Sequence, residues 1–181
     1  TVGADASSHQ TENAPRIAYF VPESEYFTLT IQASSFQSLQ GGLKNPMKIG
    51  LGRTIEQEYQ RLMMSIAMIC GAVLGIGLFT LMFSAFSLAN GGKTKRIFIF
   101  GIFIVFLALH NLFSAPYAYT TFLNLSCSWG IRLEYLFSFL AILFFLSYMF
   151  LLSSRYLHRW VYSAAMLLLS FNIGVTLWAE P

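Results

Sequence analysis

The sequence predicts a mainly α-helical, polytopic membrane helix bundle that carries a short β segment before its first membrane span. Two observations support this fold class. Hydrophobic residues make up 56% of the chain, aromatic residues 17% and charged residues only 10%, whereas charged residues form about a quarter of ordinary soluble domains. Eleven of the 19 Lys, Arg, Asp and Glu residues precede Leu62, so the remaining two thirds of the chain is nearly uncharged.

The first third of the chain divides into a polar tail and an alternating segment. Residues 1–16 lack apolar periodicity, and we expect a flexible N-terminal segment. Residues 17–53 place apolar side chains at every second position, which predicts short strands at Ile17–Val21, Phe27–Ala33 and Met47–Leu51. Because three short strands do not bury a core by themselves, we expect this segment to be the end of a larger β domain.

Residues 54–181 form the predicted transmembrane region, with Thr54 as a candidate N-cap of a polar helix that leads into the first span. Four apolar runs each reach the roughly 20 helical residues that a hydrocarbon core of about 30 Å requires. These runs cover about residues 62–89, 97–115, 133–153 and 160–179. A soluble bundle would need a polar face on each helix, which these runs lack, so the lipid bilayer is the expected partner.

The basic residues between the apolar runs predict the orientation. They lie in the first and third connections, at Lys93, Lys95, Arg96, Arg155 and Arg159. Cytoplasmic loops of membrane proteins are enriched in Lys and Arg. We therefore expect these two connections in the cytoplasm, and the β segment and the C-terminal end outside.

Polar groups inside a span are costly, and they mark functional sites by default. His110 and Asn111 in the second run and Asn172 in the fourth are therefore candidate ligand-binding residues, and hydrogen bonding to a neighbouring helix is the alternative for each. Gly71 and Gly75 form a small-xxx-small stripe that favours close helix packing, either within the chain or in a homodimer.

Motifs for catalysis are absent from the sequence. It contains no HExxH motif, no Gly-rich phosphate loop, no paired carboxylates within a span and no Cys/His cluster with metal-ligand spacing. We therefore expect no enzyme, no catalytic residue, no metal and no cofactor. The net charge of +3 also gives no indication of nucleic acid binding.

Three stretches resemble bacterial seven-transmembrane receptors with diverse intracellular signalling modules, the 7TMR-DISM family. They are the run Leu29–Phe36 with the following pair Gly41-Gly42, the stretch Leu133–Leu140 at the start of the third span, and Pro181 after the fourth. The likeness covers roughly residues 26–181. This chain has Ser35 where the family often has Asn.

The resemblance implies that residues 17–53 end an extracytoplasmic jelly-roll sensor domain, and that the chain is a fragment from a bacterial inner membrane receptor. It further implies more spans and a cytoplasmic signalling module in the full-length chain. A carbohydrate or another small ligand would bind the outer domain and shift helix packing across the bilayer. The alternative is a small-solute transporter or channel subunit, which the polar pair His110 and Asn111 motivates.

Overall fold

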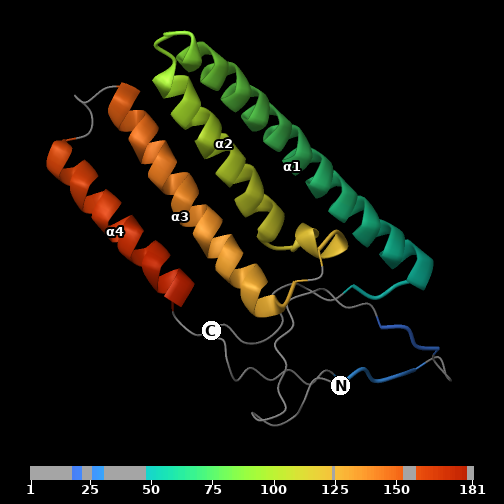
Figure 1. Ribbon diagram of the computed structural model, residues 1–181. Helices are drawn as coiled ribbons and strands as arrows, with labels where there is room; N and C mark the ends of the chain where they lie inside the picture. The colour runs from blue at the N-terminus through green and yellow to red at the C-terminus, as the bar shows by residue number, and fades with distance from the viewer. Residues whose placement is uncertain (1–17, 22–25, 31–47, 124, 153–157, 179–181) are drawn as a thin grey trace.

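The computed structural model describes residues 18–21, 26–30, 48–123, 125–152 and 158–178. All four α-helices in this part of the chain are long and apolar enough to cross a membrane. The chain is therefore a multi-pass membrane protein with a mainly helical fold, as the sequence predicts. Figure 1 shows the elements, which are α1 (Gly52–Ala89), α2 (Lys95–Phe113), the 3-10 helix η1 (Ala118–Thr121), α3 (Cys127–Leu152) and α4 (Arg159–Trp178).

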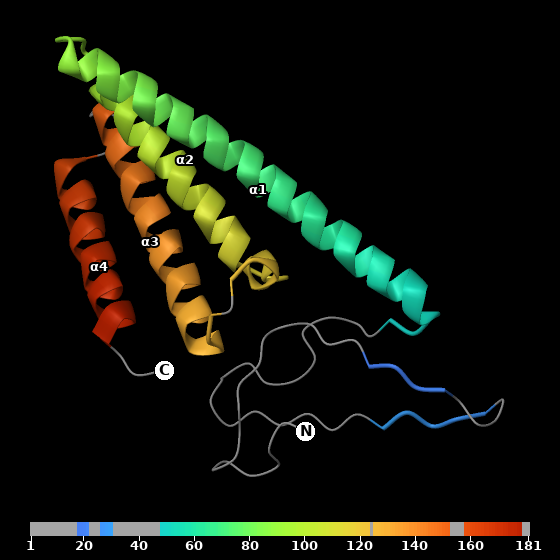
Figure 2. The same ribbon diagram turned by 45° about the vertical axis from the view of Figure 1, so that its right-hand side comes forward.

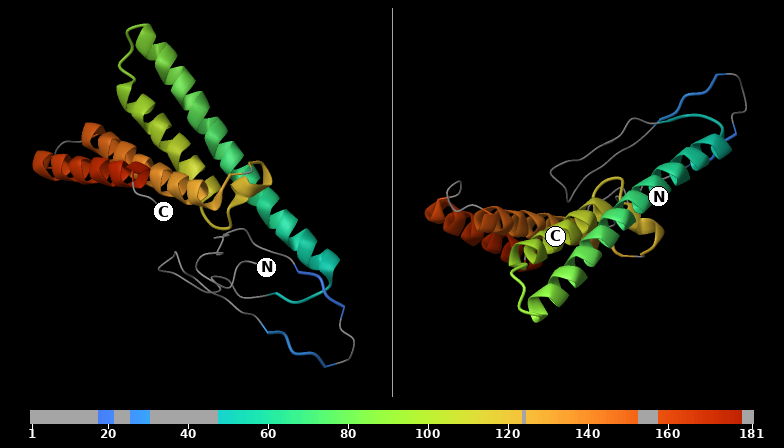
Figure 3. Two further views of the ribbon diagram at one scale, coloured as in Figure 1. Left: turned by 60° about the horizontal axis from the view of Figure 1, so that its bottom comes forward. Right: turned by 90° about the horizontal axis from the view of Figure 1, so that it is seen from above.

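The four helices stand in a row. Within the described part of the chain, α1 packs on α2, α2 on α3 and α3 on α4, and these are the only α-helix pairs in contact (Figures 1 and 3). The bundle is thus open, with α1 and α4 at its two edges. Large apolar side chains are exposed on both edge helices, including Phe79, Phe86, Leu167 and Phe171. In a bilayer such side chains contact lipid at no cost, because lipid tails are as apolar as they are.

The two ends of the row differ in their connections. The α1–α2 connection, the C-terminal end of α3 and the N-terminal end of α4 lie at one end, and η1 lies at the other (Figure 1). Lys93, Lys95, Arg96 and Arg159 therefore gather at one end, which we call the basic end. Arg155 lies outside the described residues. The opposite end is called the η1 end. The cytoplasmic location of the basic end stays a prediction.

One seam of α1 faces α2. The buried residues of α1 are Met63, Cys70, Gly77 and Ser84, and their spacing of seven keeps them on one side of the helix. A Cβ atom at Gly77 would lie 2.9 Å from Val105 Cγ2. The two helices therefore approach closely where a side chain is missing.

A second glycine makes the same contact from the side of α2. A Cβ atom at Gly101 would lie 3.0 Å from the Leu81 side chain. Gly71 and Gly75, the glycines singled out from the sequence, have no atom within 4 Å of their missing Cβ and lie on the exposed side of α1. Within the described part of the chain, the glycines that bring α1 and α2 together are thus Gly77 and Gly101. A homodimer through Gly71 and Gly75 stays a prediction.

Aromatic rings fill the contact between α2 and α3. Three ring pairs have centroid distances of 5.0 to 5.6 Å, namely Phe100 with Tyr148, Phe103 with Phe145 and Phe106 with Phe144. The smaller contact between α3 and α4 contains the stacked pair Phe150 and Tyr162, with a centroid distance of 4.4 Å. The aromatic residues of the third span thus serve helix packing on both of its sides.

Helix α1 is longer than a membrane is thick. Its 38 residues correspond to about 57 Å at 1.5 Å per residue, against a hydrocarbon core of about 30 Å. Figure 2 shows its N-terminal part extending past η1. The helix begins at Gly52, with Leu51 as N-cap, so the sequence-based choice of Thr54 as N-cap is wrong. The Thr54 N–H donates to the Leu51 carbonyl at 2.9 Å and belongs to the first turn.

The predicted strands do not appear where the structure describes the segment that should contain them. Residues 18–21, 26–30 and 48–51 contain no strand, and residues 1–17, 22–25 and 31–47 lie outside the described residues. A strand requires a neighbouring strand for its backbone hydrogen bonds, and short isolated strands are marginal in water. In these described residues, the alternating apolar pattern therefore does not produce strands.

Candidate functional site

The residues that precede α1 are attached to its first two turns. The Tyr19 hydroxyl donates a hydrogen bond to Glu56 Oε2 at 3.3 Å, and Lys48 Nζ donates to Glu58 Oε2 at 2.8 Å. The Tyr19 ring also lies against Gly52, where a Cβ atom would come within 2.8 Å of a ring carbon. We call these five residues the junction, because they connect the segment that contains Tyr19 and Lys48 to the first membrane helix.

Charge contributes to both polar contacts of the junction. The Lys48 ammonium, through its hydrogen bond and its charge, holds the pKa of Glu58 below its usual value. Partial desolvation and, second, the Glu56 carboxylate raise the pKa of Tyr19. Both contacts are exposed, where ion pairs stabilise weakly. Their effect is to set the position of the N-terminal segment on α1.

At the η1 end, the connection between α2 and α3 packs into a small core. Phe113 stacks on Tyr119 with a centroid distance of 4.6 Å and meets Phe137 edge-on at 5.3 Å. Tyr117 completes the buried cluster, which we call the η1 cap. Because η1 also contacts α1, the η1 cap links α1, α2 and α3 at one point.

The antiparallel register of α1 and α2 shows where α1 meets the η1 cap. Gly77 lies opposite Val105, and Leu81 lies opposite Gly101. Extending this pairing along α1 brings Met63 level with η1, and Met63 is only 3% exposed. A displacement of α1 would therefore act on the η1 cap as well as on α2.

Of the polar residues predicted inside the spans, His110 and Asn111 are neighbours on α2, and Asn172 lies apart from them on α4. His110 reaches across to α3, where its Nδ1 lies 3.2 Å from the Glu134 carbonyl oxygen. Asn111 and Asn172 each donate to a carbonyl one turn back in their own helix, at Leu107 and at Leu168. Because α2 and α4 are not in contact, the structure does not bring the three residues together. Of the three, only His110 makes a hydrogen bond to another helix, as the alternative interpretation expected.

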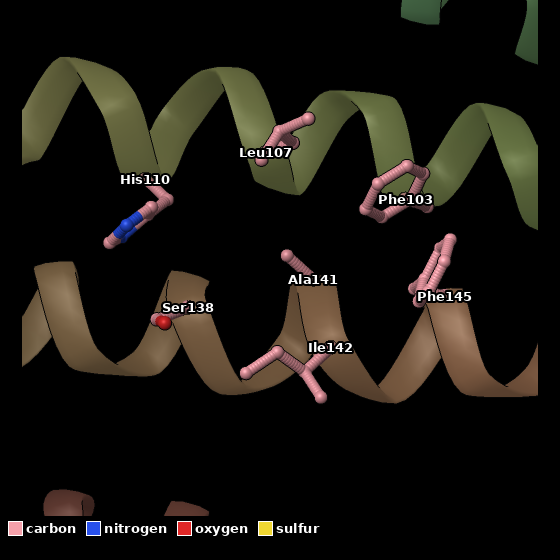
Figure 4. A pocket seen from close by; sticks show the side chains of 7 residues that line it. All are labelled: Phe103, Leu107, His110, Ser138, Ala141, Ile142 and Phe145. Atoms are coloured by element: carbon pink, nitrogen blue, oxygen red, sulfur yellow. The ribbon is translucent and has the colours of Figure 1, made fainter.

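His110 also borders an open groove between α2 and α3. The groove has a volume of about 300 Å³ and is lined by Phe103, Leu107, His110, Ser138, Ala141, Ile142 and Phe145. Figure 4 shows His110 and Ser138 facing each other at one end, with Phe103 and Phe145 at the other. Sequence reasoning missed Ser138. Its only signal was a hydroxyl placed one helical turn after Glu134 in an otherwise apolar stretch.

Groups that could hold a metal ion do not cluster in the part of the chain that the structure describes. No set of three His, Cys, Asp or Glu side chains lies close enough together there. His110 lies near the η1 end and His158 at the basic end, just before α4.

The chain was also compared with known proteins. No protein-family model, curated protein or solved structure matches it.

Proposed function

We propose that this chain is the membrane-embedded sensor and transducer part of a bacterial signalling receptor. It would pass an extracytoplasmic signal through helix rearrangement to a cytoplasmic output module in the full-length protein. The observation that best supports this function is the continuity of α1, which runs as one helix from the junction at Gly52 to the basic end at Ala89. A continuous helix transmits a displacement along its axis, because every residue is hydrogen-bonded to the next turn.

The route of the signal follows from the contacts of α1. A ligand-induced movement of the N-terminal segment would act on α1 through Tyr19 and Lys48. Helix α1 would then shift against the η1 cap and along its seam with α2. The open row leaves α1 free of α3 and α4, so that α1 can move without disturbing the whole set of helices. A ligand produces such a shift only if it binds one packing state better than the other.

Orientation is the first requirement of this function and can be measured with reporter fusions in a bacterial inner membrane. We expect Ser38 outside, Gly92 inside, Ser126 outside and Pro181 outside. A reporter at Gly92 that is active outside would place the N-terminal segment in the cytoplasm and contradict the sensor role.

Transmission along α1 can be measured by electron paramagnetic resonance. Nitroxide labels at Ala89 and Trp160, both exposed at the basic end, report the separation of the edge helices after the native cysteines have been replaced. We expect Glu58→Lys, which turns the contact with Lys48 into a repulsion, to change this distance distribution. The control Gln57→Lys adds a charge to the same exposed turn, where the Gln57 side chain makes no hydrogen bond to a described residue, and it should leave the distance unchanged. Equal distributions in both variants would contradict transmission along α1.

A small-solute transporter is the second candidate function. Transporters usually have broken helices or ionisable groups near the middle of the membrane, whereas α1, α2, α3 and α4 are each continuous. Replacing both His110 and Asn111 by Leu separates the two functions. Loss of solute uptake in reconstituted vesicles would favour the transporter, and the receptor function predicts no uptake to lose.

A further inference from the structure

The groove between α2 and α3 has one polar end and one apolar end. His110 and Ser138 form the polar end, and the remaining lining residues are apolar or aromatic. His110 lies three residues before the end of α2, which is about 5 Å from that helix end, and Phe103 lies about 10 Å deeper. The polar end is thus near a membrane surface, and the apolar end is near the middle of the bilayer.

The hydrogen bonds at the polar end leave two groups available. A carbonyl oxygen only accepts, so His110 Nδ1 carries the proton in the contact with Glu134, and Nε2 of the neutral ring is an acceptor. Serines in spans commonly donate to the carbonyl four residues back, as Ser147 does to Leu143. For Ser138 that carbonyl belongs to Glu134, which already accepts from His110. Within the described part of the chain, the Ser138 hydroxyl has no hydrogen-bond partner.

We infer that this groove binds a single-chain lipid whose head group is a hydroxyl or a protonated carboxyl, such as a free fatty acid or a long-chain alcohol. Such a head group both donates and accepts. Its O–H would donate to His110 Nε2, and its oxygen would accept from the Ser138 hydroxyl. The alkyl chain would lie along Leu107 and Ala141 toward Phe103 and Phe145.

The size and the access of the groove agree with this ligand. Its volume of about 300 Å³ lies at the lower end of the range for small-molecule sites, and it suits part of one chain. Ile142 and Phe145 are exposed on the surface of the row, and no other described α-helix contacts both α2 and α3. A lipid can therefore enter sideways from the bilayer. Binding at this site does not depend on the proposed signalling function.

Photolabelling of the full chain in phosphatidylcholine nanodiscs tests this site. The probes are palmitic acid and cetyl alcohol, each with a diazirine in the middle of the chain, and labelled peptides are mapped by mass spectrometry. We expect label near Phe103 and Phe145 that excess unlabelled lipid removes. Capture of only the acid or only the alcohol would identify the preferred head group, and either result supports the site.

Two variants make the test specific. Ser138→Ala removes one hydrogen bond and should reduce capture about fivefold, whereas the control Ser147→Ala, on the same helix but outside the groove, should not. Ala141→Phe fills the groove and should abolish capture, whereas Ala164→Phe on the exposed side of α4 should not. Label that spreads over all four helices and is unchanged in Ser138→Ala and Ala141→Phe would overturn the proposal.

Discussion

The Tyr119 side chain of the η1 cap lies directly against the backbone of Gly130 at the start of α3. A Cβ atom at Gly130 would come within 2.7 Å of Tyr119 Cζ and still closer to the hydroxyl oxygen. Only glycine fits this position without displacing the ring. The contact fixes the beginning of α3 relative to η1, and through η1 relative to α1.

Replacing Gly130 by Ala should destabilise the protein by about 1–3 kcal/mol, the usual cost of overpacking. Thermal unfolding in detergent of a protein that also carries Cys127→Ser, followed with a thiol-reactive dye that detects exposure of the buried Cys70, measures the change. Gly174→Ala is the matched control, because no atom lies within 4 Å of its missing Cβ. If Gly130→Ala were as stable as the unchanged protein, the Tyr119 ring would be able to move away from residue 130 at little cost in free energy.

Replacing the glycines of α1 by alanine should distinguish the side of this helix that packs on α2 from its exposed side. Gly77→Ala places a methyl group against Val105 and should lower stability by about 1–3 kcal/mol. Gly71→Ala and Gly75→Ala should be neutral or stabilising by up to about 1 kcal/mol, because Ala is the better helix former. The same unfolding assay compares all three. A loss of inter-chain crosslinking in Gly71→Ala or Gly75→Ala alone would indicate that these glycines serve a homodimer.

The packing of the edge helix α4 on α3 should depend on Tyr162. Its ring stacks on Phe150, and its hydroxyl lies 3.3 Å from Ser147 Oγ. Tyr162→Phe keeps the ring and should cost about 1 kcal/mol for one hydrogen bond. Tyr162→Ala also loses the ring and should cost about 3 kcal/mol. Hydrogen exchange of α4 peptides measures the loosening, and equal exchange in the two variants would show that the ring contact contributes nothing.

The junction should loosen in acid. Because Lys48 lowers the pKa of Glu58 in the folded protein, this carboxylate stabilises the junction above its ordinary unfolded pKa. The contribution is lost as the pH falls through the lowered pKa. A nitroxide at Ile49, which is exposed, should therefore become more mobile in this acidic range. In Glu58→Gln the label should be mobile throughout, and an unchanged acid response in that variant would assign the effect to another group.

Much of the architecture followed from the sequence alone. The number of apolar runs and the near absence of charge after Leu62 predicted four membrane helices, because the length of apolar helix needed to cross a bilayer is a local property of the chain. The basic residues Lys93, Lys95 and Arg96 also predicted that the first connection lies on the same side of the membrane as the third. In the structure they lie at the same end of the row as Arg159.

The choice of packing faces was decided only by the tertiary structure. Gly71 and Gly75 have the spacing of a packing stripe, yet Gly77 and Gly101 make the close approach, because the side of a helix that is buried depends on the surface of its neighbour. The same holds for the groove, where His110 takes the Glu134 carbonyl and leaves the Ser138 hydroxyl available. A sequence determines which segments enter the membrane through apolar length, whereas hydrogen bonds between helices depend on their register and rotation, which only the packed structure defines.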